Sequence, residues 1–251
     1  MTLAHVPPKG VGNQTRRVQR AVWVSSPRGA RLNSFKPGAL TVYGLCLDCN
    51  NGTSGIDDPA YIDFHREVER YLRPSMRRLL IEPTEIPARV APGLVARSVL
   101  AGMFALNDRM QEHYPDLAHA VRTDGADRVL PDDLSLRLAL TPGPHARIGG
   151  PVSFTRVLGQ RQLHSPYADI WFPPLAWCLT SSRPGPAQLG PEVSSTWADV
   201  SEWIRYRSET TVDLRNLVGR LTFAVAPQFG GEDWVTMLGD SMTAIEGRIV
   251  A

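Results

Sequence analysis

The chain has 251 residues, of which 43% are hydrophobic and 21% are charged, and its formal net charge is +2. This length suits one large domain or two small ones, and six tryptophans among long apolar segments exclude a wholly disordered chain. Three cysteines are too few for a disulfide framework, and the most apolar helix-like run is too short to span a bilayer. We therefore expect a soluble, cytoplasmic protein with reduced thiols and no membrane partner.

Positive charge is concentrated at the N-terminus. Residues 1–47 contain seven basic residues and no acidic one, whereas the rest of the chain holds 20 Lys and Arg against 25 Asp and Glu. A basic segment on an acidic body favours a polyanionic partner, although a solvated basic loop explains the charge equally well. The basic residues are Lys9, Arg16, Arg17, Arg20, Arg28, Arg31 and Lys36.

The first part of the chain predicts two strands followed by a helix. Residues 20–26 and 38–47 are rich in β-branched and aromatic residues, which favours a β-hairpin with a long basic connection. A helix should follow, with Asp58 as its N-cap and Pro59 at its first helical position. Its apolar face, at helical spacing, consists of Tyr61, Phe64, Val68, Tyr71 and Leu72.

The rest of the chain is expected to be mixed. A linker, "EPTEIPARVAP", precedes a second helix over about residues 93–113. A further helix should begin near Thr196, where Asp199 completes the pattern of a capping box. Short strands are predicted at "RLALT", "VSFTRVL", "DIWF", "LAWCLT", "TTVDLR", "RLTFAVA" and "WVTML". The predicted fold class is α+β, with one domain over residues 1–81 and a second, of unknown role and with short antiparallel strands, over residues 93–251.

The order of three N-terminal motifs carries a family resemblance. "AHVPPKGVGN" comes first, "LCLDCNNG" follows the second predicted strand, and "IDDPAYIDFH" opens the helix. This order resembles that of the HNH, or ββα-metal, endonucleases. In that family a His on the first strand is the general base, and an Asn after the second strand orients it. An acid, Asn or His near the start of the helix helps to hold a divalent cation.

Over roughly residues 4–72, the resemblance implies a role for each matching residue. His5 matches the base, Asn50 the orienting Asn, and Asp58 the ligand of a Mg²⁺ or Mn²⁺ ion, with Asp57 as its substitute. The implied activity is metal-dependent hydrolysis of DNA phosphodiester bonds, with the N-terminal basic residues on the phosphates. Histidine suits the base because its pKa lies near neutrality.

Simpler readings of the same residues remain open. His5 also fits a frayed N-terminal residue, since chain ends are often poorly ordered. Asn50 fits ordinary turn chemistry before Gly52. Asp58 fits the helix N-cap described above, and that role leaves fewer oxygens for a metal.

The pair Cys46 and Cys49 matches one zinc knuckle of the family, where many members have two. Two cysteines are half of the ligands that a closed structural zinc site needs, which argues against zinc held by this chain alone. In the family the first knuckle precedes the catalytic His. Either Met1 is therefore an internal Met of a longer chain that carries this knuckle upstream, or the domain does not use zinc. The spacing to the predicted helix argues against a redox role for the pair.

A further departure from the family leaves other functions open. Ala4 stands where the family often has an acidic metal ligand. The alternative function is therefore a non-catalytic nucleic-acid-binding or interaction protein that retains the ββα shape. A third reading places a partner-binding role in the aromatic-rich second half of the chain.

Overall fold

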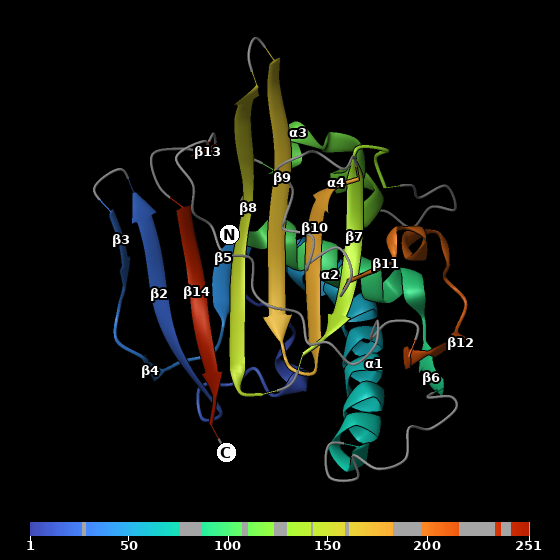
Figure 1. The fold of residues 1–251 in the computed structure, drawn as a ribbon. Helices are drawn as coiled ribbons and strands as arrows, with labels where there is room; N and C mark the ends of the chain where they lie inside the picture. The colour runs from blue at the N-terminus through green and yellow to red at the C-terminus, as the bar shows by residue number, and fades with distance from the viewer. Residues whose placement is uncertain are drawn as a thin grey trace.

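A large antiparallel sheet with two long helices packed on one face dominates the molecule (Figure 1). The computed structural model describes residues 1–26, 29–75, 87–106, 110–122, 130–141, 143–158, 161–182, 197–215, 234–236 and 242–250. The described residues contain four α-helices besides the sheet, which confirms the expected mixed α+β class.

The large sheet has the strand order β11-β7-β10-β9-β8-β14-β2-β3, with β13 paired to β8 and β4 paired to β2. Strands β8 and β9 have 14 and 12 residues, so the expectation of short strands is wrong for them. The bounds are β2 (Val18–Ser26), β3 (Gly29–Leu32), β4 (Lys36–Pro37), β7 (Leu134–Leu140), β8 (His145–Leu158), β9 (Arg161–Phe172), β10 (Leu175–Ser181), β11 (Ala198–Asp199), β13 (Trp234–Thr236) and β14 (Met242–Ile249).

Two small antiparallel ribbons and the helices complete the fold. The ribbons are β1 (Thr2–His5) with β5 (Thr41–Leu45), and β6 (Pro87–Val90) with β12 (Thr210–Asp213). The helices are α1 (Ser54–Ser75), α2 (Pro92–Leu106), α3 (Met110–His113) and α4 (Pro115–Arg122). Shorter turns are the 3-10 turns η1 (Lys9–Val11) and η3 (Ser201–Arg205) and the π-helical turn η2 (Cys49–Thr53).

Strict alternation of side chains along the central strands builds the core. In β10, Leu175, Trp177 and Leu179 join the main apolar cluster with α1 and α2. The residues between them, Ala176 and Cys178, belong to a second cluster with Trp171 and Trp197. Because successive side chains of a strand point to opposite faces, both faces of β10 are buried.

The predicted hairpin of residues 20–26 with residues 38–47 is wrong. Strand β2 pairs with β14, from Val18↔Ile249 to Ser25↔Met242, whereas β5 pairs with β1. The local pattern gives these strands but not their partners: β2 pairs with β14 at the other end of the chain and with β3 and β4 inside the predicted connection. Strands from both predicted domains share the large sheet, and the division at residues 81–93 stays a prediction.

The expected N-cap of α1 is also wrong. Helical structure begins at Leu47, continues through η2 and runs into α1, so Asp58 and Pro59 lie inside the helix. The turn after β5 therefore supplies the start of the helix. The predicted apolar face is confirmed: its members are buried or packed against the core.

The remaining boundaries differ in detail. The predicted helix over about residues 93–113 corresponds to α2, described to Leu106, and to α3, Met110–His113, with residues 107–109 outside the described part of the chain. Part of the predicted linker forms β6. Thr196 and the predicted strand "RLTFAVA" lie outside the described residues. The helix expected there is the five-residue turn η3. Asp199, which precedes this turn, accepts a hydrogen bond at Oδ1 from the Ser201 N–H at 2.9 Å.

No described helix combines the length and the apolar character needed to cross a membrane.

A close approach joins the β1–β5 ribbon to α2. Gly44 of β5 faces the backbone carbonyl of Ala105, and a Cβ at this position would overlap the carbonyl oxygen. Any larger residue would therefore push the ribbon away from α2. This contact fixes β1, the strand that carries His5, against the helical layer.

A buried ion pair joins α1 to α2. Arg97 Nε lies 2.9 Å from Asp57 Oδ2, and their side chains are 2% and 1% exposed. Removing one partner of such a pair leaves a buried charge without compensation, which costs far more than an exposed pair is worth. The pair therefore fixes the orientation of α1 relative to α2.

Replacing Arg97 by Met should lower the free energy of unfolding by about 3–5 kcal/mol, because Asp57 is then buried without its cation. The double variant Asp57→Leu/Arg97→Met should recover much of that loss, since no charge remains buried. Urea unfolding of the three proteins measures both effects. A single variant as stable as wild type would contradict the assigned role.

Candidate functional site

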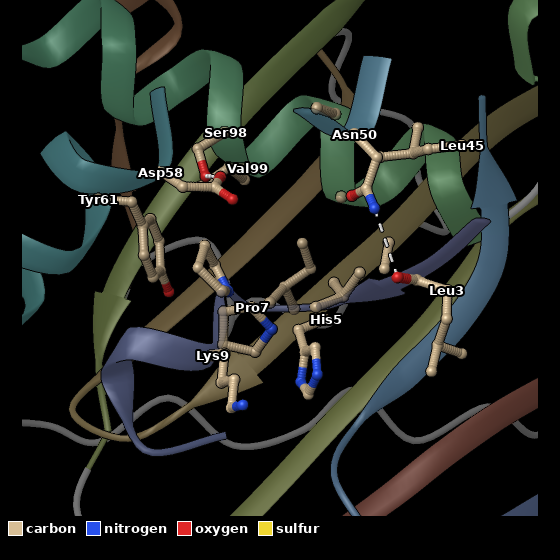
Figure 2. Close-up of a pocket in the computed structure, with 16 residues that line it drawn as sticks. Leu3, His5, Pro7, Lys9, Leu45, Asn50, Asp58, Tyr61, Ser98 and Val99 are labelled. Atoms are coloured by element: carbon tan, nitrogen blue, oxygen red, sulfur yellow. Dashed lines mark hydrogen bonds between the residues drawn. The ribbon is translucent and has the colours of Figure 1, made fainter. Parts of the chain in front are cut away.

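A cavity of about 180 Å³ lies where β1, η1, the turn after β5, α1 and α2 meet (Figure 2). Three of the residues singled out by the sequence line it: His5, Asn50 and Asp58. Lys9 from the basic N-terminal segment lines it as well. Residues from separate parts of the chain thus meet at one concave surface.

His5 stands at the end of β1 with a defined tautomer. Its Nδ1 lies 3.1 Å from the main-chain oxygen of Asn13. A carbonyl oxygen accepts and cannot donate, so Nδ1 carries the proton and Nε2 has a free lone pair in the neutral ring. Burial lowers the pKa of His5 below the ordinary 6.5, which keeps the ring neutral at physiological pH.

Asn13 holds the backbone around His5. Its side chain is fully buried, and Nδ2 donates to the Pro7 oxygen at 2.7 Å and to the Leu40 oxygen at 2.9 Å. Its Oδ1 accepts from the Leu40 N–H at 2.7 Å. One amide thus ties the segment after β1 to the segment before β5.

Asn50 connects the turn after β5 to β1. Its main-chain N–H donates to the Cys46 oxygen at 2.9 Å, and its side-chain Nδ2 lies 3.4 Å from the Leu3 oxygen. Figure 2 shows this side chain reaching toward β1. Asn50 therefore bonds the strand that carries His5, two residues away from His5 itself.

Asp58 lies on the helical side of the cavity. The Ser98 hydroxyl donates to Asp58 Oδ1 at 2.7 Å. Burial raises the pKa of Asp58 from 3.8 to about 6, against the smaller opposing effect of the Ser98 hydrogen bond. In Figure 2 the carboxylate faces Ser98, whereas the His5 ring points away from it.

Asp57, the predicted substitute for Asp58, does not line the cavity. Its side chain is 1% exposed and pairs with Arg97. The neighbouring carboxylates of α1 therefore have different surroundings: Asp57 forms a structural ion pair, and Asp58 faces the cavity.

Cys46 and Cys49 lie beside the cavity without lining it. Cys46 is exposed and Cys49 is half-buried, with their sulfurs 2.8 Å apart. The hydrogen bond from the Cys49 side chain lowers the pKa of Cys46, and burial raises the pKa of Cys49. Within the described residues, no group of three or more His, Cys, Asp or Glu side chains is arranged to hold a metal ion.

Comparison of the sequence with models of known protein families finds no match, and neither do searches of curated proteins and of solved structures. The chemistry of the cavity therefore provides the basis for a proposed function.

The other basic residues are distributed over several elements. Lys9 is at the cavity, Arg16 and Arg17 are exposed in the loop before β2, and Lys36 is exposed in β4. Arg20 donates a hydrogen bond to Thr41 Oγ1 at 2.9 Å. Arg31 lies in β3, but its side chain is outside the described part of the chain, as is all of Arg28.

The sequence did not reveal three residues of the site. Asn13 follows the left-handed Gly12, so "GVGN" is typical of a turn and gives no sign of a buried bridging amide. Ser98 and Tyr61 belong to apolar helical patterns that indicate core packing. Only the folded structure shows that Ser98 and Tyr61 line the cavity.

Asn13→Ala should lower the free energy of unfolding by about 2–4 kcal/mol, because three buried main-chain groups lose their partner. Gln14→Ala is the matched control: its side chain accepts a hydrogen bond from Arg16 at the surface, so this substitution should change stability by about 0.5 kcal/mol or less. Urea unfolding measures both. Equal effects of the two substitutions would contradict the bridging role.

Asp58→Asn should change stability in a pH-dependent way. The folded-state pKa of about 6 lies above the ordinary 3.8, so the folded protein favours the neutral carboxyl and Asp58 becomes destabilising as pH rises through this range. Asn stays neutral, so the variant should gain at most about 3 kcal/mol over wild type near pH 7 and little near pH 4. Urea unfolding at both pH values is the test, and the same difference at each would contradict it.

Proposed function

We propose that this protein hydrolyses phosphodiester bonds of nucleic acid, with DNA as the expected substrate, in a metal-assisted reaction of the HNH type. The observation that carries the proposal is the joint presence of His5, Asn50 and Asp58 at one cavity with Lys9. The resemblance assigns the same three residues to one site, in the same chain order.

His5 is the general base in this proposal. Its ring is neutral, and the bond from Nδ1 to the Asn13 oxygen leaves Nε2 to accept a proton from water. Asn50 acts as a positioning residue, because its side chain bonds the main chain of β1 at Leu3.

Asp58 supplies the kind of ligand that a hard divalent cation such as Mg²⁺ needs. Magnesium is usually held by one or two carboxylates, several waters and the phosphates of the substrate, rather than by a cage of protein ligands. A single carboxylate at a concave surface meets that requirement, and Ser98 orients its other oxygen. The cation would stabilise charge on the phosphate and on the leaving oxygen.

The basic residues support binding of the phosphate backbone. Lys9 at the cavity and the exposed Arg16 and Arg17 are free of acidic neighbours in sequence. Such contacts position a strand without reading its bases, and they weaken as salt competes for the phosphates.

The test is nicking of supercoiled plasmid in Mg²⁺ or Mn²⁺. Wild type should nick the plasmid, and His5→Ala should lower the rate by about 10²–10⁴-fold, the usual contribution of a general base. His113→Ala, which removes an exposed histidine of α3, should leave the rate unchanged. No nicking by wild type, or equal nicking by His5→Ala, would contradict catalysis.

A non-catalytic nucleic-acid-binding protein is the second candidate. Two observations favour it: Ala4 occupies the position of the usual acidic ligand, and the His5 ring points away from Asp58 (Figure 2). Binding to DNA that falls steeply with salt, without cleavage, would select it. No binding at low salt would exclude both candidates.

A further inference from the structure

The CxxC pair occupies the start of a long helix. Cys46 directly precedes the first helical residue, Leu47, and Cys49 opens η2, which continues into α1. The sequence placed the helix start near Asp58, and on that basis the spacing argued against a redox pair. The observed helix removes that objection, because a CxxC at a helix start is the arrangement of redox dithiols.

The two sulfurs are arranged for reaction with each other. They lie 2.8 Å apart and share a hydrogen bond. The Cys49 main-chain N–H also donates to Cys46 Sγ, at 3.1 Å. Closure to a disulfide of about 2.0 Å needs a movement of less than an ångström. The main-chain donor favours negative charge on Cys46 Sγ.

The two thiols also differ in access to solvent. Cys46 is exposed, whereas Cys49 is half-buried. An incoming reagent therefore meets Cys46 more readily, and Cys49 lies within reach of a sulfur bound at Cys46. Cys178, the third cysteine, is buried in the sheet and takes no part.

We propose that Cys46 and Cys49 form a redox-active dithiol that reduces disulfide substrates, with Cys46 as the attacking thiol and Cys49 as the resolving thiol. This function goes beyond the proposed hydrolysis, and neither sulfur lines the cavity. It needs no zinc, and the described residues supply no third side chain that would complete a metal site with the pair.

The reaction is a two-electron exchange. The Cys46 thiolate attacks a disulfide R–S–S–R, which forms a mixed disulfide and releases one R–S⁻. Cys49 then loses its proton and attacks Cys46 Sγ, which closes the intramolecular disulfide and releases the second R–S⁻. The two protons lost by the cysteines are taken up by the two thiolates, so R–S–S–R is reduced to two R–SH while the dithiol is oxidised.

The test uses the full chain in mixtures of reduced and oxidised glutathione. After acid quenching, alkylation and mass spectrometry should show one intramolecular Cys46–Cys49 disulfide that forms and disappears reversibly with the mixture. Resistance of Cys178 to alkylation before unfolding reports that the protein stays folded, since this thiol is 1% exposed.

Two single substitutions then assign the roles. With oxidised glutathione, Cys49→Ser should accumulate a mixed disulfide on Cys46 about tenfold faster than Cys46→Ser does on Cys49, because the attacking thiol is the exposed one. Equal rates, or faster reaction at Cys49, would overturn the assignment. Failure to form the intramolecular disulfide in any mixture would overturn the proposal. Stoichiometric uptake of zinc that blocks alkylation of both thiols would do the same.

Discussion

The buried side chain of Asn13 is the interaction on which the candidate site depends. Its side-chain amide bonds Pro7 and Leu40, and the main-chain oxygen of Asn13 accepts from the ring of His5. The first bonds hold the β1 and β5 segments in register, and the last sets the tautomer of the candidate base. A single buried residue therefore fixes both the backbone segments around the cavity and the tautomer of His5. The side-chain bonds are kept because an unpaired buried amide would be costly.

The opposite wall depends on two adjacent contacts between α1 and α2. Asp57 pairs with Arg97 and Asp58 with Ser98, so consecutive residues of one helix meet consecutive residues of the other. The buried pair fixes the helices, and the polar pair beside it remains at the cavity. This arrangement explains how neighbouring carboxylates with the same chemistry acquire different roles: one lies in the core, and the other is accessible from the concave surface.

The sequence drew attention to three residues that line one cavity, but not to the contacts that build the cavity. Motif order placed His5, Asn50 and Asp58 together, and helical spacing gave the buried face of α1, because both signals are local. The pairing of β2 with β14 joins the two ends of the chain, and no local pattern carries it. Asn13 was missed because its side-chain partners lie in other segments. The start of the helix at Leu47 was missed because Asp58-Pro59 imitates a helix N-terminus, so the position of the CxxC pair at the helix start was missed as well.

The proposed function requires that His5, Asn50 and Asp58 form one site that takes a divalent cation. Substoichiometric Mn²⁺ added to ¹⁵N-labelled protein tests this requirement, since the paramagnetic ion broadens only nearby NMR signals. We expect selective broadening of the His5 ring and Asn50 side-chain resonances, which Asp58→Asn should abolish. Broadening that spares these two residues, or that persists unchanged in Asp58→Asn, would contradict it.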